Sequence, residues 1–416
     1  MRSATSSRDP EVVIVGAGPA GATAARALAS AGVRVTLLDR ARFPRNKPCG
    51  GGISLRVLRR FPYLSSALPR IATHTVTRLR LETPDGTWAI VDAGEPAVLM
   101  VRRVEFDALL VSLATDAGAA LVCGADVAQT REDAGGVSVT TRDGRVFRAR
   151  IVVAADGVNS VVARRLGFNG GWPASAVALD MMEETPRADL RDTDPSMLWI
   201  QYGERGYSYV FPKRDHVNVG IGYVLSHFRE SVDIPPYGLQ QRFVEALRDR
   251  GVLAGASVRR NFTPFLLPVG GPLKSVARGR VLVAGDAGGF VNAFTAEGIY
   301  YAMVTGDLAA RAILDGCGDP RRTTAAYGRA CEREIGRELR DSVAIQRYLF
   351  RDPRRIRRAI RGAKNAMAIT DLVCNLATGR RSYTDVRRRI LARSPMLAAR
   401  TAFEYLLSRP TKISSM

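Results

Sequence analysis

The chain has 416 residues, of which 46% are hydrophobic and 24% are charged, and this composition predicts a globular protein with two domains and a large core. It contains no run of about 18 uncharged apolar residues, which excludes a membrane-spanning helix. The five cysteines lack the spacing of metal ligands and residues 1–7 lack the apolar core of a signal peptide, so we expect free thiols, no metal site and a cytoplasmic location.

The formal net charge of +21 is concentrated near the C-terminal end. Residues 341–416 contain 17 Lys and Arg against 5 Asp and Glu, so these 76 residues carry a net +12. Such a segment favours an anionic partner. Because the sequence has no nucleic-acid-binding signature, we expect no nucleic acid but a peripheral contact with the inner face of a membrane, with a solvated charged surface as the alternative.

The first structural unit predicted from the sequence is a strand, a glycine turn, a helix and a second strand. The β-branched residues 12–15 precede a glycine-rich turn at residues 16–21, and helix formers follow at residues 22–31. Gly32 ends the helix before a strand at residues 33–39. This order is that of a βαβ dinucleotide-binding site, and a fold with similar glycines but no ligand is the alternative.

Three glycines and one acid give this unit its expected chemistry. Gly16 allows a tight turn, Gly18 lets the backbone approach a pyrophosphate, and Gly21 lets the helix lie close to the strand. The helix N-terminus offers free N–H groups and a positive dipole end to the phosphates. Asp39, at the end of the second strand, is expected to accept hydrogen bonds from the ribose hydroxyls.

Two later strands also end in an acid beside a glycine. Residues 151–155 predict a buried strand before Asp156-Gly157, and residues 278–284 predict another before Gly285-Asp286. With the first unit, they resemble the three fingerprints of the aromatic-hydroxylase-like FAD superfamily, which implies FAD rather than NAD. In that resemblance Asp286 lies against the flavin ribityl and pyrophosphate, and a helix from Glu297 points its N-terminus toward the flavin ring. Plain turn formation is the alternative for both acids.

The loop after the first unit carries a more specific resemblance. Its residues 43–52, Phe-Pro-Arg-Asn-Lys-Pro-Cys-Gly-Gly-Gly, resemble the signature of the geranylgeranyl reductase family, FAD enzymes that saturate prenyl chains. The glycines allow the backbone to approach a flat ligand closely. By position in the family, Cys49 is expected near the flavin ring, and a small apolar residue that fills a gap is the alternative.

The next segments leave the FAD domain and return to it. Alternating residues 75–91 around a turn at 84–86 predict a hairpin in a second sheet. A helix then begins at Arg103 and resembles the family's Arg-x-x-Phe-Asp-x-x-Leu, which implies that Arg103 contacts FAD; a solvated arginine is the alternative. Residues 137–141 and 146–150 predict a small antiparallel hairpin before the second fingerprint.

Three strands predicted in the second domain carry the family's substrate motif. They span residues 196–202, 206–212 and 217–223. The motif, Tyr-x-Trp-x-Phe-Pro followed by Gly-x-Gly, matches Tyr207, Tyr209, Phe211, Pro212, Gly220 and Gly222, with Tyr209 in place of the family tryptophan. The two glycines favour a cavity in which a long flexible chain lies, and an aromatic core strand is the alternative.

The third fingerprint departs from the family pattern at two positions. Where the family favours Asn-Pro-x-x-Gly-Glu-Gly-Ile, this chain has Asn-Ala-Phe-Thr-Ala-Glu-Gly-Ile at residues 292–299. Helices are predicted at residues 300–312 and 323–348, and short basic helices at 354–361 and 387–391.

The predicted fold class is α/β, with a Rossmann-like FAD-binding domain of the aromatic-hydroxylase type, an inserted mainly antiparallel substrate-binding sheet and a helical C-terminal region. The expected FAD-binding domain comprises residues 9–56, 98–170 and 275–340, the substrate domain 57–97 and 171–274, and the basic region 341–416. The residues expected to hold FAD are Gly16, Gly18, Ala20, Gly21, Asp39, Arg40, Cys49, Gly50, Gly51, Arg103, Asp156, Gly157, Gly285, Asp286, Gly298 and Ile299.

The function implied by the resemblance is hydrogenation of isolated C=C bonds in a polyprenyl group, carried by a diphosphate or a lipid. An isolated alkene has no carbonyl to polarise, so a positioned proton donor is required. Cys49 is the first candidate, and Tyr207 and His216 are the next. If the protein reduces prenyl chains, NAD(P)H or a reduced ferredoxin-like carrier is expected to supply the electrons. A flavin monooxygenase acting on an aromatic or quinone ring and a non-catalytic flavin redox sensor are the alternatives.

Overall fold

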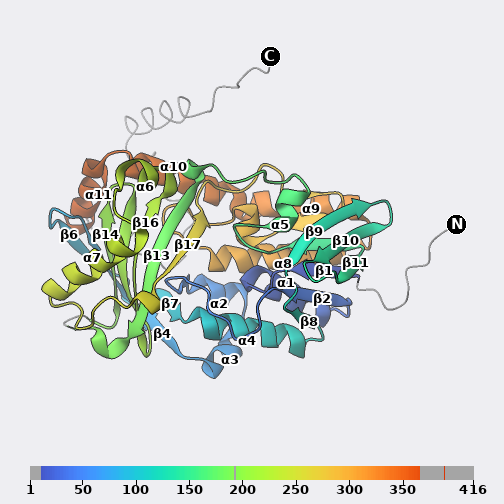
Figure 1. Cartoon of the computed structure of the whole chain (residues 1–416), viewed down its shortest axis with the longest axis horizontal. Coiled ribbons are helices and arrows are strands. Elements are labelled where there is room, and N and C mark those ends of the chain that lie inside the picture. Colours follow the sequence, from blue (N-terminus) through green and yellow to red (C-terminus); the bar gives the residue numbers. More distant parts are fainter. Residues whose placement is uncertain (1–10, 192–193, 366–387, 389–416) are drawn as a thin grey trace, which may run out of the picture.

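The computed structural model describes residues 11–191, 194–365 and 388, which are built around two large sheets (Figure 1). A six-stranded sheet and a seven-stranded sheet occupy opposite ends of the molecule in this view, and two three-stranded sheets accompany them. The arrangement confirms the predicted α/β class with a separate, mainly antiparallel sheet.

The six-stranded sheet contains the predicted dinucleotide strands in the order β18-β19-β12-β1-β2-β8. Its strands are β1 (Val12–Val15), β2 (Val35–Asp39), β8 (Ala120–Cys123), β12 (Ile151–Ala154), β18 (Ala277–Arg278) and β19 (Val281–Val283). All neighbours are parallel except β18 and β19. Because parallel strands are covered on both faces, β1 and β12 are fully apolar and fully buried. Their carboxyl ends meet at one edge, where the glycine turn follows.

Four helices pack around this sheet: α1 (Pro19–Ser30), α4 (Arg103–Asp116), α8 (Ile299–Gly316) and α9 (Pro320–Cys331). Helix α1 begins three residues before the predicted start, because Pro19 suits the first turn of a helix. It approaches α8 so closely that a side chain at Gly306 would lie 2.2 Å from the carbonyl oxygen of Ala20. The helix predicted at residues 323–348 is divided into α9 and α10 (Arg337–Phe350) by a π-helical segment, η6 (Glu332–Gly336).

The seven-stranded sheet has the order β17-β13-β16-β15-β14-β5-β6, with only β5 and β14 parallel. Its strands are β5 (Arg78–Glu82), β6 (Trp88–Asp92), β13 (Val177–Pro186), β14 (Met197–Gly203), β15 (Gly206–Pro212), β16 (His216–Val224) and β17 (Thr263–Pro268). The strand pairs predicted at residues 196–223 are confirmed.

The predicted hairpin at residues 75–91 is correct for β5 and β6 but begins too early. Thr75 and Val76 belong to β4 (Thr73–Val76), which pairs with β7 (Val98–Val101) in a three-stranded sheet with β3 (Gly52–Ser54). The chain changes sheets at Thr77, whose N–H donates to the carbonyl of Ser196. Alternation of apolar residues does not reveal such a change of partner.

The remaining elements lie outside the two large sheets. The predicted small hairpin is confirmed as β10 (Gly136–Thr141) and β11 (Val146–Ala149), joined by β9 (Val127–Asp133). The other helices are α2 (Arg56–Arg60), α3 (Tyr63–Ala67), α5 (Val161–Arg165), α6 (Leu225–Ser231) and α7 (Pro236–Asp249). Single 3-10 turns occur at η1 (Leu68–Arg70), η2 (Ala174–Ala176), η3 (Arg187–Asp189), η4 (Arg259–Asn261) and η5 (Gly285–Gly288).

Helix α11 (Pro353–Asn365) matches the first predicted basic helix and covers β5 and β6. Its Ile356 and Ile360 are buried against Leu79, Leu81 and other apolar side chains of that hairpin. Exposed arginines lie on its other side, at Arg354, Arg358 and Arg361. The basic helix predicted at 387–391 lies outside the described residues except for the exposed Arg388. Among the residues that the structure describes, no helix is both long enough and apolar enough to cross a membrane.

Candidate active site

The glycine turn after β1 combines two close contacts with one open position. A Cβ atom at Gly16, where φ is +98°, would lie 2.2 Å from the carbonyl oxygen of Ala155. One at Gly21 would lie 1.8 Å from the carbonyl oxygen of Gly16. A Cβ atom at Gly18 would approach nothing closer than Arg45 Nη2, at 3.7 Å. The space above Gly18, at the N-terminus of α1, therefore has room for a phosphate.

A buried carboxylate positions two arginines beside this space. Asp107, whose side chain is 0% exposed, accepts from Arg103 Nε at 2.6 Å and Nη2 at 2.8 Å. Its Oδ2 also lies 3.1 Å from Arg45 Nη2. Within residues 11–191 and 194–365, the buried Nη1 of Arg45 finds no hydrogen-bond acceptor. Since buried donors are almost always paired, this atom indicates an anionic ligand near Gly18.

The acids of the first two fingerprints make bonds within the protein. The carboxylate of Asp39 accepts from the backbone N–H groups of Ala17 and Ala41, each at 2.8 Å. Asp156 accepts from Ser160 and from two N–H groups at the start of α5, and its burial raises its pKa. Asp156 thus shapes the turn. A side chain at the neighbouring Gly157 would meet no other atom within 4 Å. Arg40, which follows β2, is exposed.

The residues of the third fingerprint lie close to one another and to the start of α1. Gly285, with φ of +60°, packs against Ala20, because a Cβ atom there would lie 3.1 Å from the methyl carbon of Ala20. A Cβ atom at Gly298 would lie 3.4 Å from Asp286 Oδ1, so this carboxyl faces the start of α8 at Ile299. Burial raises the pKa of Asp286, and the charges of Lys47 and Arg103 oppose that rise.

The departure from the family pattern at residues 292–299 has a structural consequence. Ala296 has φ of +56°, in the left-handed region that glycine adopts without cost. Asn292 Oδ1 accepts from the N–H groups of Phe294 and Thr295, at 3.0 Å each, and so fixes the loop. Glu297 accepts from the backbone of Ser54 at 3.0 Å. These hydrogen bonds offset the cost of the left-handed conformation at Ala296.

The loop containing Cys49 lies between the seven-stranded sheet and the three-stranded sheet formed by β3, β7 and β4. The N–H of Cys49 contacts Met182 Sδ at 3.1 Å, and Asn218 Nδ2 donates to the Cys49 carbonyl at 3.3 Å. The N–H of Gly51 donates to Cys49 Sγ at 3.4 Å. Met182 and Asn218 belong to β13 and β16, so the seven-stranded sheet holds the cysteine backbone directly.

Both glycines after the cysteine are required by close approaches. A Cβ atom at Gly50 would lie 2.8 Å from the ring of Phe211 on β15. Gly51, with φ of +77°, would place one 2.1 Å from the carbonyl oxygen of Val101 on β7. A larger residue at either position would separate the loop from one of the two sheets.

Two rows of residues cross the face of the seven-stranded sheet that the Cys49 loop contacts. Residues in register on neighbouring strands share a face. The first row is Phe265, Asp180, Gly222, Tyr207 and Tyr202, and the second is Thr263, Met182, Gly220, Tyr209 and Ile200. The glycines of β16 therefore leave room between β13 and β15 that the side chains of Tyr209 and Asp180 enter, and the cavity for a long flexible chain stays a prediction.

The side chain of Tyr209 lies over Gly220. Its hydroxyl oxygen would be 2.3 Å from a Cβ atom at Gly220, so the missing side chain makes room for the ring. The ring packs on Phe211, with 4.4 Å between centroids. The Tyr209 hydroxyl donates to Asp180 Oδ1 at 3.1 Å, and the two residues are only 3% and 6% exposed. At the end of β15, Pro212 pairs with Val217.

The predicted proton donors occupy different places. Tyr207 lies in the first row, and its hydroxyl donates to the carbonyl of Thr295 at 3.2 Å. His216 is the first residue of β16, four residues before Gly220, which corresponds to about 13 Å along a strand. Its Nδ1 lies 3.0 Å from Asp215 Oδ1. The structure thus places Tyr207 beside Gly222, on the face that the Cys49 loop contacts, and separates His216 from these glycines along β16.

Sequence reasoning gave no role to Asp180, which lies on β13, or to Lys47, which lies in the cysteine loop itself. Burial raises the pKa of Asp180 to about 7, although the hydrogen bond from Tyr209 and the charge of Lys47 oppose this. Burial and Arg103 lower the pKa of Lys47, whose Nζ lies 4.9 Å from the ring centroid of Phe265. A lone acid inside the apolar sequence Ala-Leu-Asp-Met-Met was the available signal.

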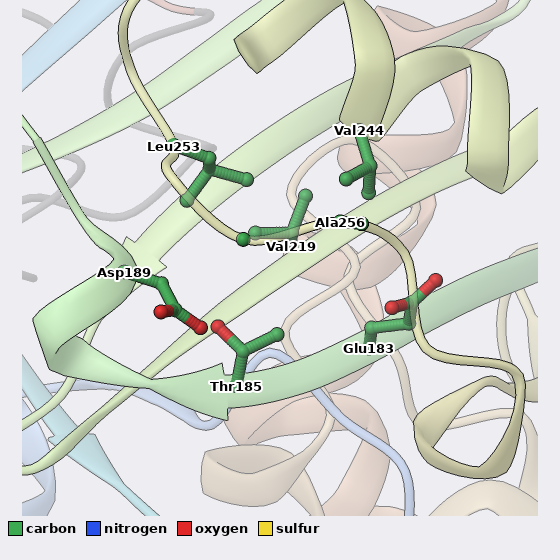
Figure 2. A pocket seen from close by; sticks show the side chains of 8 residues that line it. Glu183, Thr185, Asp189, Val219, Val244, Leu253 and Ala256 are labelled. Carbon is green, nitrogen blue, oxygen red and sulfur yellow. The ribbon is translucent and has the colours of Figure 1, made fainter.

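A small cavity lies on the opposite face of the seven-stranded sheet, between β13, β16 and α7 (Figure 2). Its volume is about 10 Å³, the size needed by about one water molecule. Figure 2 shows Glu183 and Asp189 on either side of Thr185, with Val219, Val244 and Leu253 opposite. This cavity is too small for a prenyl chain and does not adjoin Cys49.

The fold and the phosphate turn define an FAD-binding protein. Residues 9–306 match the family described as FAD binding domain. The open space above Gly18, the unpaired donor of Arg45 and the nearby Asp286 fit this cofactor. The chain is thus an FAD-dependent oxidoreductase. Its relatives show to which family of these enzymes it belongs.

The chain belongs to the geranylgeranyl reductase family. It is 32% identical to geranylgeranyl diphosphate reductase of Rhodobacter capsulatus, over 73% of this chain and 75% of the relative. It is also 33% identical to menaquinone reductase of Mycobacterium tuberculosis, over 73% and 76%. A geranylgeranyl bacteriochlorophyll reductase-like protein from Thermoplasma acidophilum has the same fold, with a TM-score of 0.77, 21% identity and coverage of 92% of this chain and 98% of that one.

The different surroundings of Gly18 and Gly21 predict different defects on substitution by alanine. Gly18→Ala should leave the fold intact but weaken FAD binding by at least about tenfold, because its methyl group occupies only the open space. Gly21→Ala should reduce the folded fraction, because its methyl group meets the backbone of Gly16. FAD titration by flavin fluorescence, with thermal unfolding of the cofactor-free proteins, distinguishes the two. Normal FAD affinity in folded Gly18→Ala would place the pyrophosphate elsewhere.

Proposed function

We propose that the protein hydrogenates isolated C=C bonds of a polyprenyl group. The observation that carries the proposal is the packing of the Cys49 loop against the face of the seven-stranded sheet that contains Gly220 and Gly222. Aromatic rings on β15 and the buried Met182 make this face largely apolar, which suits a chain of methylene and methyl groups. The relatives named geranylgeranyl diphosphate reductase support the same chemistry.

Bound FAD in its reduced form supplies the hydride for such a reaction. The protein's own task is to hold the double bond, exclude water and deliver a proton to the second carbon. We assign the proton to Cys49, whose thiol is held by the N–H of Gly51. Arg103 and Lys47 lie near this thiol.

The proposed substrate is a prenyl diphosphate or a prenylated lipid, and the proposed electron donor is NAD(P)H or a reduced ferredoxin-like carrier. A prenylated quinone is a second candidate, which the relatives named menaquinone reductase favour. Gly220 and Gly222 do not discriminate between head groups, because they are expected to contact only the hydrocarbon chain.

The proposed reaction predicts that anaerobically reduced holoprotein adds two hydrogen atoms to each double bond it reduces. Geranylgeranyl diphosphate, a prenylated quinone and a geranylgeranylated glycerolipid are the substrates to compare, with mass spectrometry of the products and the flavin spectrum as readouts. Insertion of oxygen into a ring in aerobic samples would instead support a monooxygenase. Flavin that is reduced and reoxidised without any change in the three substrates would support a redox sensor.

The proposed role of Cys49 predicts graded defects. Cys49→Ala should lower the rate of prenyl saturation by at least about 10²-fold, since general acids contribute this much, while Cys49→Ser should keep a small residual rate. Both variants should retain FAD and its spectrum. Cys123→Ala is the matched control, because Cys123 is also a free, half-buried thiol. A wild-type single-turnover rate in Cys49→Ala would make Cys49 only a packing residue.

We also propose that the basic side of α11 contacts an anionic membrane. Its apolar side is already buried on β5 and β6, so the exposed Arg354, Arg358 and Arg361 form a charged surface and not an inserting one. A peripheral electrostatic contact of this kind would bring a lipid substrate near the protein. Removal of residues 341–416 would expose the hairpin that α11 covers, so charge substitution is the cleaner test.

Replacing Arg354, Arg358 and Arg361 by Gln should weaken binding to anionic vesicles by about 3 kcal/mol, at about 1 kcal/mol per residue. Binding should also weaken with salt, because the Debye length is about 8 Å at physiological ionic strength. The matched control replaces Arg321, Arg322 and Arg329, the exposed arginines of α9. Co-sedimentation measures both. Equal losses in the two triple variants, or equal binding to neutral vesicles, would exclude α11 as the contact.

A further inference from the structure

Few large apolar side chains are exposed in the part of the chain that the structure describes, and two of them share one strand. Trp88 is 42% exposed and Ile90 is 41% exposed, and both lie on the same side of β6. The other two such side chains among the described residues, Val146 and Leu314, lie apart on β11 and α8. A neighbouring pair on one strand indicates a contact surface, whereas scattered single residues do not.

Trp88 and Ile90 belong to a face of the seven-stranded sheet that is only partly covered. Helix α7 packs on this face against β15, β16 and Trp199 of β14. Beyond β14 the face continues over β5 and β6, where Ile90 lies opposite Arg80. The Arg80 guanidinium carbon is 5.5 Å from the ring centroid of Trp88. The uncovered part of the face therefore combines two apolar side chains with a cation.

The opposite face of the same hairpin carries α11. Strand β6 is the last strand of the sheet, and α11 packs over its buried side chains Ala89 and Val91. Arg357 of α11 also pairs with Asp85, in the turn before β6, at 2.5 Å. Figure 1 shows β6 and α11 at the same end of the molecule. The exposed arginines of α11 and the apolar pair of β6 thus lie on the two sides of one sheet edge.

The charges along this edge favour an anionic partner at one end of β6. Of the acids beside Trp88, Asp85 pairs with α11, and the buried Glu82 lies 2.9 Å from Arg250. The exposed Asp92 is four residues from Trp88, which corresponds to about 13 Å along a strand. The end of β6 that begins at Trp88 is therefore the one that an anionic surface would approach.

We propose that Trp88 and Ile90 insert into the headgroup region of an anionic bilayer, which rests on the membrane contact proposed above for α11. A flat surface laid against the edge of β6 meets the arginines of α11 on one side and the apolar pair on the other. Tryptophan favours the membrane interface, because its ring is apolar and its N–H stays near water. The arginines attract the lipid head groups, and the apolar pair adds an attraction that salt does not screen.

A bilayer fits this edge better than a second copy of the chain does. Stable protein interfaces bury about 800 Å² on each partner, which is more than two half-exposed side chains provide. In a symmetric pair the arginines beside β6 would also approach their own copies. Insertion into a bilayer needs no complementary surface, because apolar area and attraction to anionic lipid determine its strength.

Trp88 reports its own insertion. When vesicles that contain phosphatidylserine are added to the holoprotein, tryptophan emission should shift to shorter wavelength, and lipids brominated on their acyl chains should quench it. Trp88→Phe should remove both signals but keep most of the binding, because phenylalanine retains an apolar ring. Trp199, which is only 7% exposed, and Trp172, whose N–H donates to the carbonyl of Val158, provide the unchanged background.

Binding at high salt separates the apolar pair from the arginines. In about 1 M salt the Debye length is about 3 Å, so the remaining binding should depend on β6. Trp88→Ala combined with Ile90→Gln should weaken it by at least about tenfold, the factor that burial of one large apolar side chain contributes. Val146→Gln combined with Leu314→Gln is the matched control, because these side chains are also exposed, and it should bind like wild type. The α11 triple variant should lose mainly the salt-sensitive part.

Each outcome supports or overturns the insertion of β6. Absence of wild-type binding to anionic vesicles would exclude the membrane contact and the insertion with it. Binding without a change in Trp88 emission, or wild-type binding by the Trp88 and Ile90 double variant in about 1 M salt, would exclude the insertion alone. If the α11 variant binds like wild type and the β6 variant does not, the contact of α11 is wrong and the insertion stands.

Other occupants of this surface are also detectable. A dimer that forms without vesicles and depends on Trp88 would replace the bilayer by a second copy of the chain. Poor quenching of Trp88 by acrylamide in the free holoprotein would show that another part of the chain covers the strand, and it would overturn the proposal. These measurements follow binding and not catalysis, so they stay decisive even if the protein reduces no prenyl substrate.

Discussion

The close passage of residues 49–51 between two sheets is the constraint on which the site depends. The carbonyl of Val101 limits one side of this loop and the ring of Phe211 limits the other, and each allows only a glycine. The cysteine before these glycines is then fixed by backbone bonds to Met182 and Asn218. A reactive group is thus located by main-chain contacts, which change less than side-chain rotamers do.

Buried ionic networks hold the nucleotide side of the site in the same way. Asp107 fixes Arg103 and Arg45, so the loop before Cys49 is tied to α4. Arg56 lies 3.4 Å from Glu297 and 2.9 Å from Glu338, which joins the start of α8 to α10. Removing one partner of such a buried pair leaves the other charge without compensation, at a cost of about 3–5 kcal/mol. These networks therefore favour one arrangement of the segments that surround the cofactor.

Local sequence signals predicted the parts of this architecture that depend on local conformation. The glycine turn, the helix that follows it and the paired strands of the second sheet each follow from backbone preference or periodicity within a short segment. The change of sheet at Thr77 could not be found in this way, because it depends on a hydrogen bond to Ser196, far along the chain. The separation of His216 from Gly220, in contrast, follows from their spacing within one extended strand.

Asp180 shows the same limit at the level of the site. Its sequence neighbours suggest only an unexpected acid in an apolar segment. Its meaning depends on the alignment of three strands, which sets the carboxyl opposite Gly222 and one row away from Tyr209. Long-range register is not encoded in any one of those strands, so the row across the sheet becomes visible only in the folded chain.

The tyrosine that replaces the family tryptophan at position 209 links these observations. An indole N–H donates a hydrogen bond but accepts none. A phenol does both, and the missing side chain of Gly220 gives its hydroxyl the space to reach Asp180. The substitution that weakens the match to the motif is also the one that gives the buried acid of β13 a hydrogen-bond partner on β15. Departure from a family pattern at such a position thus changes which polar group the sheet can bury.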